Sequence, residues 1–176
     1  MPEIIIIAGP NGAGKTSFAT EYLTGAKAEW PFVNADEIVG GMSSSRLPAV
    51  QLDIRAGRVM LEQVANLVEM RADFALETTL ATLGYSKKVP RWQGLGYSVG
   101  LIYLRLPSAE HAIARVQRRV SAGGHDVPEE VVRRRFDKSL AYLERVYKAL
   151  VNEWYIFDSL EGEFREAETW KGEKRR

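Results

Sequence analysis

The sequence lacks cysteine, which excludes disulfide bonds, cysteine-ligated metals and thiol catalysis. It has two histidines, and His125 has no second ligand at a spacing that suits a metal site. Excess charge is also missing: 24 basic and 23 acidic side chains leave a net charge of +1, so nucleic acid and membranes are not expected partners. No apolar run is long enough to span a membrane, and the run at residues 4–8 has no basic leader. We therefore expect a cytoplasmic protein, folded as one domain over residues 1–176.

The most specific motif is a G-x-x-x-x-G-K-T phosphate-binding loop at residues 9–16, directly after the apolar run Ile4–Ala8. Its β-branched residues predict a strand buried on both faces, and the glycines let the backbone wrap a phosphate. A predicted helix follows from Ser17, with its amino-terminal N–H groups facing the anion. We expect Lys15 to contact the β- and γ-phosphates and Thr16 to ligate Mg²⁺. The predicted nucleotide-binding residues of this segment are Gly9, Asn11, Gly12, Ala13, Gly14, Lys15, Thr16 and Ser17.

Strand and helix patterns alternate along the rest of the chain, which is typical of a parallel sheet covered on both sides. The pattern predicts an α/β, P-loop kinase-like three-layer sandwich with a mainly parallel five-stranded sheet and a helical lid. The predicted strands are 4–8, 32–34, 74–76, 99–104 and 154–157, and the later helices are 48–70, 109–120 and 128–151. Residues 40–45 are expected to form a loop. The charge-mixed tail after residue 160 is expected to fray.

Carboxylates follow two of the predicted strands at the edge where open α/β sheets bind ligands. Asp36, after the second strand, is the candidate general base that takes a proton from an attacking hydroxyl. Its neighbour Glu37 is either a substrate ligand or a carboxylate favoured by the helix dipole. Glu77 ends the third strand, where it could order Mg²⁺ waters or bind a substrate hydroxyl, and Thr78 and Thr79 could donate to phosphate or sugar.

A local excess of arginine predicts a lid. Seven arginines and four acids lie between residues 105 and 135, on both sides of the Gly123-Gly124 hinge. Arginines flanking a flexible loop suit a lid over residues 115–136 that closes over ATP and neutralises charge on the transferred phosphoryl group. Arg115 and Arg119 share a helix face in this reading. Arg118 and Arg133 are expected to be solvated helix-face residues.

These features together resemble the zeta-toxin family of P-loop kinases, in its short chromosomal form. The matching stretches are residues 8–16, Asn34–Ile38, Glu77–Thr79, Gly84-Tyr85, Gly96-Tyr97, Arg115-Val116, Arg119-Val120, Gly123–Pro128, Arg134–Phe136 and Ser139-Leu140.

The resemblance implies ATP-dependent phosphoryl transfer to a hydroxyl of a small molecule, with Asp36 as the base and Arg119 and Arg134 over the phosphates. It also implies a UDP-N-acetylhexosamine-type nucleotide sugar as one candidate acceptor, and an inhibitory antitoxin as a partner.

Other nucleotide-dependent activities remain open at this point. The chain has no Asn-Lys-x-Asp guanine signal of a GTPase and no Ser-Gly-Gly signature of an ABC-type motor. A polynucleotide or RNA-end kinase, an ATPase without an acceptor, and a module that binds nucleotide without turnover share the phosphate-binding loop. The set of Lys15, Thr16, Asp36 and lid arginines disfavours the module without turnover, whereas an RNA-end kinase stays open because the arginines could also bind a nucleic-acid phosphate.

Overall fold

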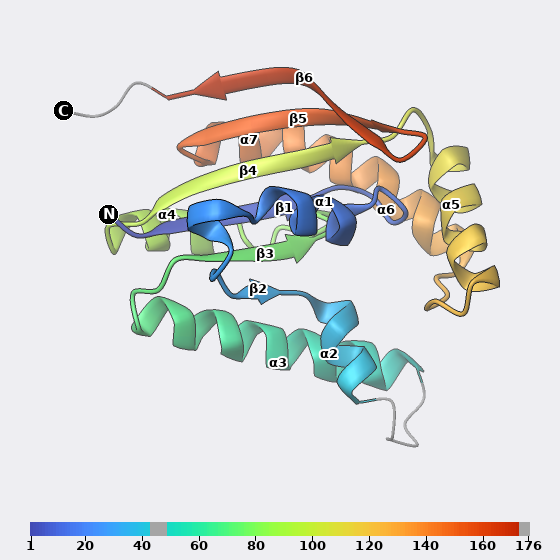
Figure 1. Cartoon of the computed structure of the whole chain (residues 1–176), viewed down its shortest axis with the longest axis horizontal. Helices are drawn as coiled ribbons and strands as arrows, with labels where there is room; N and C mark the ends of the chain where they lie inside the picture. The colour runs from blue at the N-terminus through green and yellow to red at the C-terminus, as the bar shows by residue number, and fades with distance from the viewer. Residues whose placement is uncertain (43–48, 173–176) are drawn as a thin grey trace.

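A six-stranded sheet forms the middle layer of the computed structural model, which describes residues 1–42 and 49–172 (Figure 1). The strand order is β2-β3-β1-β4-β5-β6, and the first five strands in this order are parallel. The strands are β1 (Glu3–Ala8), β2 (Phe32–Val33), β3 (Phe74–Thr78), β4 (Ser98–Arg105), β5 (Glu153–Leu160) and β6 (Glu163–Lys171). All five predicted strands are present, and the predicted α/β P-loop kinase-like fold is confirmed. The predicted number of strands was wrong, because β6 adds a sixth strand to the sheet.

Helices cover both faces of the sheet (Figure 1). They are α1 (Lys15–Tyr22), η1 (Gly25–Lys27), α2 (Ala35–Gly41), α3 (Ala49–Glu69), α4 (Lys88–Gly94), α5 (Ala109–Ser121), α6 (Glu129–Tyr142), the π-helical turn η2 (Leu143–Tyr147) and α7 (Lys148–Leu150). The predicted helix 128–151 is thus interrupted by a π turn, and its proposed beginning at Pro128 is the N-cap of α6. Gly40 and Gly41 belong to α2 and not to the predicted 40–45 loop, and the serines of that loop and the Pro48 start of the long helix lie outside the described residues.

The alternation of side chains along β1 divides the core into two layers. Ile4 and Ile6 face a cluster built with α3, α4 and η2, whereas Ile5 and Ile7 face a cluster built with α1, α5 and α6. All four isoleucines are buried, as expected of a parallel strand covered on both faces. No helix among the described residues is long and apolar enough to cross a membrane.

The expectation that the tail frays after residue 160 was wrong for residues 161–172. β6 pairs antiparallel with β5, and the hairpin turns at Glu161 and Gly162, which both have positive φ. Such a two-residue turn matches the twist of the flanking strands. Phe164 anchors the strand by packing edge-on against Phe18, with 5.1 Å between ring centroids. The mixed charges that suggested disorder instead line a solvated edge strand, where they suit an exposed position.

Candidate active site

The phosphate-binding loop connects β1 to α1 and is shaped by close backbone approaches. At Gly9, whose φ is +149°, an added Cβ would lie 2.5 Å from the carbonyl oxygen of Leu104. At Gly12, whose φ is +79°, it would lie 2.8 Å from the carbonyl oxygen of Ala112. Glycine is therefore required at both positions. The loop wraps around the start of α1, whose first N–H groups are available to an anion.

Lys15 lies at the base of this loop with 7% of its side chain exposed. Its Nζ donates to the carbonyl oxygen of Pro10 at 3.1 Å and lies 3.7 Å from Glu77 Oε1. Burial lowers the pKa of the Lys15 ammonium, while the negative charges of Glu77 and Asp36 act in the opposite direction. The ammonium is thus positioned by the loop itself and by the end of β3, as a phosphate-binding lysine must be.

Thr16, Glu77 and Asn34 form a polar cluster across three elements. The Thr16 hydroxyl donates to Glu77 Oε2 at 2.9 Å, and Asn34 Nδ2 donates to Thr16 Oγ1 at 3.2 Å and to Glu77 Oε2 at 3.1 Å. Hydroxyl and carboxylate oxygens are the hard ligands that Mg²⁺ prefers, so Thr16 and Glu77 fit the predicted metal. Sequence reasoning missed Asn34 as a site residue, although its place before the acidic first turn of α2 is a readable N-cap signal.

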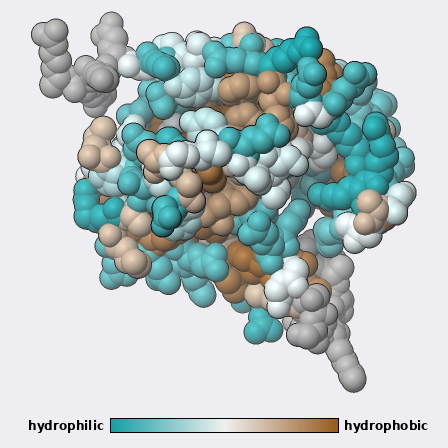
Figure 2. Space-filling model, viewed as in Figure 1, coloured by the Kyte–Doolittle hydropathy of each residue, from teal (hydrophilic) through white to brown (hydrophobic). Residues whose placement is uncertain are grey.

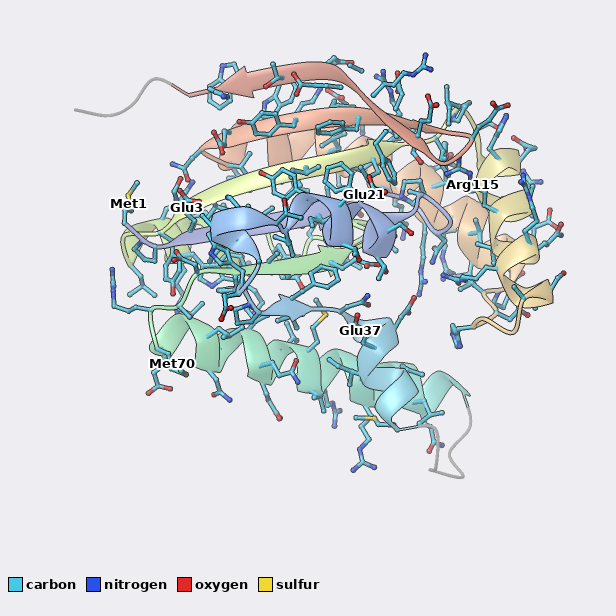
Figure 3. All side chains as sticks on the ribbon, in the orientation of Figure 1. Met1, Glu3, Glu21, Glu37, Met70 and Arg115 are labelled. Atoms are coloured by element: carbon cyan, nitrogen blue, oxygen red, sulfur yellow. The ribbon has the colours of Figure 1, made fainter. Side chains whose placement is uncertain are left out.

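The predicted base and one predicted lid arginine lie together. Arg119 Nη1 lies 3.7 Å from Asp36 Oδ2, with 36% and 55% of the two side chains exposed. Arg119 Nη2 also donates to the carbonyl oxygen of His125 at 2.9 Å, while its buried Nε has no hydrogen-bond partner within the described residues. Figure 3 shows the neighbouring Glu37 on α2 and Arg115 on α5, at the carboxyl ends of the strands. Figure 2 shows hydrophilic residues gathered at the α5 end of the molecule.

The other lid arginines differ from one another. Arg134 is exposed on α6 and makes no hydrogen bond or ion pair within residues 1–42 and 49–172. Arg133 pairs with Glu110 at 2.5 Å and with Glu129 at 2.9 Å, as expected of a helix-face residue. Arg118 is exposed, as expected of a helix-face residue, and it also borders a cavity. The structure therefore brings Arg119, but not Arg134, into contact with the candidate base.

That cavity, of about 510 Å³, lies beside the phosphate-binding loop. Its lining residues are Gly14, Ser17, Glu21, Arg115, Arg118, Ser159, Glu161, Gly162 and Phe164. Arg115 Nη1 donates to Ser159 Oγ at 2.8 Å and to the carbonyl oxygen of Gly12 at 3.3 Å, and Ser159 Oγ donates to the carbonyl oxygen of Ala13 at 2.9 Å. Sequence reasoning missed Glu161, Gly162 and Phe164 because the tail after residue 160 was expected to fray, and it missed Ser159 because its partners are far away in the sequence.

Thr78 and Thr79 have local structural contacts at the end of β3. Thr78 Oγ1 accepts from the backbone N–H of Leu80 at 3.1 Å, and the Thr79 carbonyl oxygen accepts from Ser139 Oγ at 2.6 Å. Because that serine uses its only proton in this bond, the Tyr103 hydroxyl at 2.8 Å must donate to it. These bonds fix the loop after Glu77.

Several known proteins are similar to this chain. An uncharacterized protein of Haemophilus influenzae is 26% identical over 132 residues, which cover 75% of this chain and 91% of that protein. The solved structure of AvrRxo1-ORF1:-ORF2 with ATP matches with a TM-score of 0.77 at 17% identity, over 98% of this chain and 59% of that one. The PezAT chromosomal toxin-antitoxin system of Streptococcus pneumoniae matches with a TM-score of 0.64 at 17% identity, over 90% and 68% of the two chains.

At such low identity the structural matches show the P-loop kinase-like fold alone. A family model described as an AAA domain matches residues 4–146, which include the phosphate-binding loop, the Asn34 cluster and both lid helices. Since this match covers most of the chain, the protein belongs to that AAA domain family.

Proposed function

We propose that this protein is a kinase that moves the γ-phosphate of ATP to a hydroxyl group of a small molecule. The observation that carries the proposal is the 3.7 Å approach of Arg119 to Asp36, beside the phosphate-binding loop. Asp36 is also linked to that loop through Asn34. The backbone N–H of Asp36 donates to Asn34 Oδ1, and Asn34 Nδ2 donates to Thr16 Oγ1. A base, a lid arginine and the triphosphate site thereby share one location, as transfer to a hydroxyl requires.

The loop residues proposed to bind the phosphates are the predicted ones, with Lys15 as the cation and Thr16 as the Mg²⁺ ligand. When bound, Mg²⁺ would supply positive charge to the phosphate oxygens. The cavity between α1, α5 and the β5–β6 turn has room for the nucleoside, since its volume of about 510 Å³ lies within the usual range of small-ligand pockets. Arg115 contributes to this side of the site through its contacts with Gly12 and Ser159.

In the proposed reaction, Asp36 accepts the proton of the acceptor hydroxyl as its oxygen bonds to the γ-phosphorus. The bond from that phosphorus to the bridging oxygen breaks, and ADP leaves with the electron pair. Arg119 places positive charge where negative charge redistributes on the transferred group. Arg134 is proposed to join it when the lid closes, because its guanidinium is exposed and uncommitted within the described residues.

The acceptor is proposed to be a nucleotide sugar of the UDP-N-acetylhexosamine type, on the strength of the resemblance to zeta toxins. Glu37, Glu77, Thr78 and Thr79 are the proposed acceptor contacts. An antitoxin that inhibits the kinase belongs to the same proposal, supported by the toxin-antitoxin proteins among the structural matches. A cytoplasmic location, where ATP is available, is also part of this proposal.

Product analysis tests this proposal. Purified protein is incubated with γ-labelled ATP, Mg²⁺ and a panel of nucleotide sugars, nucleosides and RNA with free ends, and labelled products are identified by mass. We expect label on a small-molecule hydroxyl, and none with Lys15→Ala, which removes a phosphate-site charge and little of the core. Label on RNA ends would replace the proposal with an RNA-end kinase. Label in free phosphate alone would indicate an ATPase.

A further inference from the structure

Asn34 is a buried polar side chain at the junction of β2 and α2, with 4% of its surface exposed. Asn34 caps helix α2, because its Oδ1 accepts from the backbone N–H of Asp36 at 2.9 Å. That cap uses one end of the amide. The other end, Nδ2, points away from α2 and donates to both Thr16 and Glu77.

The hydrogen bonds of the Thr16 hydroxyl can be assigned completely. A carboxylate only accepts, so the Thr16 proton points to Glu77 Oε2 at 2.9 Å. The Asn34 amide only donates through Nδ2, so it occupies one of the two lone pairs of Thr16 Oγ1. One lone pair remains. Asn34 and Glu77 together thus fix the rotation of the hydroxyl and the direction in which its free lone pair points.

Asn34 also holds Glu77. Its bond to Glu77 Oε2 acts on the same carboxylate oxygen that receives the Thr16 proton, while Oε1 lies 3.7 Å from Lys15. A charge-assisted bond to a carboxylate is stronger than a neutral one, and burial strengthens it further. One side chain therefore orients a hydroxyl on α1 and a carboxylate on β3, and at its other end begins the helix that carries Asp36.

We propose that Asn34 is a positioning residue for Mg²⁺ binding, which orients the Thr16 hydroxyl and the Glu77 carboxylate toward the metal. This inference rests on the proposed function, since it requires a metal-nucleotide complex at the loop. Bonds from such outer partners set the orientation of metal ligands, and their loss typically weakens metal binding about 10- to 100-fold. The competing role is that of a helix cap and nothing more.

Two substitutions separate these roles. Asn34→Ser keeps an oxygen that can cap α2 and removes the amide that reaches Thr16 and Glu77, and serine is as good an N-cap as asparagine. Asn34→Gly is a second variant with an acceptable N-cap and no side chain at all. The probe is Mn²⁺ titrated into protein saturated with ADP, with bound and free Mn²⁺ distinguished by electron paramagnetic resonance. ADP affinity in the presence of a chelator and the melting temperature are measured in parallel.

We expect both variants to bind Mn²⁺ about 10- to 100-fold more weakly, with parental metal-free ADP affinity. The melting temperature of Asn34→Ser should stay close to that of the parent. Parental Mn²⁺ affinity in either variant would overturn the inference and leave the helix cap as the sole role, and so would a parent protein that binds no Mn²⁺ with ADP. The kinase proposal is tested separately by the labelling experiment. If the variants show the expected Mn²⁺ binding but the parent protein labels no hydroxyl, the role of Asn34 stands and the proposed kinase activity fails.

Discussion

Asp36→Asn is the substitution that most directly tests the proposed chemistry, because it changes one proton acceptor and almost nothing else. Asparagine preserves the size of the side chain, and the hydrogen bond from the backbone N–H at position 36 to Asn34 Oδ1 is unchanged. What is lost is the ability to take a proton from an acceptor hydroxyl. General bases contribute about 10²- to 10⁴-fold to rate, so the transfer rate at saturating ATP should fall by that factor.

The structure also bounds the side effect of this substitution. Asp36 and Arg119 approach to 3.7 Å with 55% and 36% of their side chains exposed, and ion pairs this exposed contribute about 0–1 kcal/mol. Loss of the pair therefore changes ATP affinity by about fivefold at most, which is far smaller than the expected loss of rate.

The assay measures single-turnover transfer to the identified acceptor and, separately, ATP affinity. Glu37→Gln is the matched comparison, since Glu37 is exposed on the same helical turn. Glutamine can still hydrogen-bond at the proposed acceptor contact, so this variant should retain most activity. If Asp36→Asn transfers phosphate at nearly the parental rate while Glu37→Gln is inactive, the two roles must be exchanged. If both variants remain active, the hydroxyl-kinase mechanism has lost its base.

Arg119→Ala should lower the transfer rate about 10³-fold or more with little change in ATP affinity, whereas Arg133→Ala, whose side chain pairs with Glu110 and Glu129, should leave both unchanged; equal losses would refute the distinction between these arginines. Phe164→Ala should weaken ATP binding about tenfold, measured by calorimetry, because the ring borders the cavity beside Gly14; parental affinity would exclude β6 from the nucleotide site. Ser139→Ala should lower the free energy of unfolding in urea by about 1–3 kcal/mol, because the buried Tyr103 hydroxyl and the half-buried Thr79 carbonyl oxygen lose their bond to Ser139, and an unchanged midpoint would contradict this.

Much of the fold and half of the site could be predicted from local patterns. The isoleucines of β1 predict a buried strand, and the glycines and Lys15 that follow specify a phosphate-binding loop through short-range geometry. Asp36 and Glu77 were recognisable because parallel strands end at one edge of the sheet. In each case the relevant contacts depend on residues close in sequence or on a general rule of sheet topology.

The parts that were missed depend on contacts between residues far apart in the chain. Asn34 bonds a side chain 43 positions away, and Ser159 bonds the loop 146 positions away, so neither role can be derived from a local window. The prediction that the tail after residue 160 frays failed for a different reason. Its charges resemble a disordered segment, and only the pairing of β6 with β5 and the packing of Phe164 on Phe18 reveal a strand.

These long-range residues hold the phosphate-binding loop from two sides. On one side Asn34 joins Thr16 to Glu77. On the other side Ser159 joins Arg115 to the backbone of Ala13, and Arg115 itself donates to the carbonyl oxygen of Gly12. The first set contains the proposed metal ligands and caps the helix of the candidate base, and the second borders the cavity that is proposed to hold the nucleoside. Because the two sets share no side chain, their substitution effects should add nearly independently. Changes at Asn34 should therefore act on metal binding and transfer, and changes at the β5–β6 turn should act on nucleotide affinity.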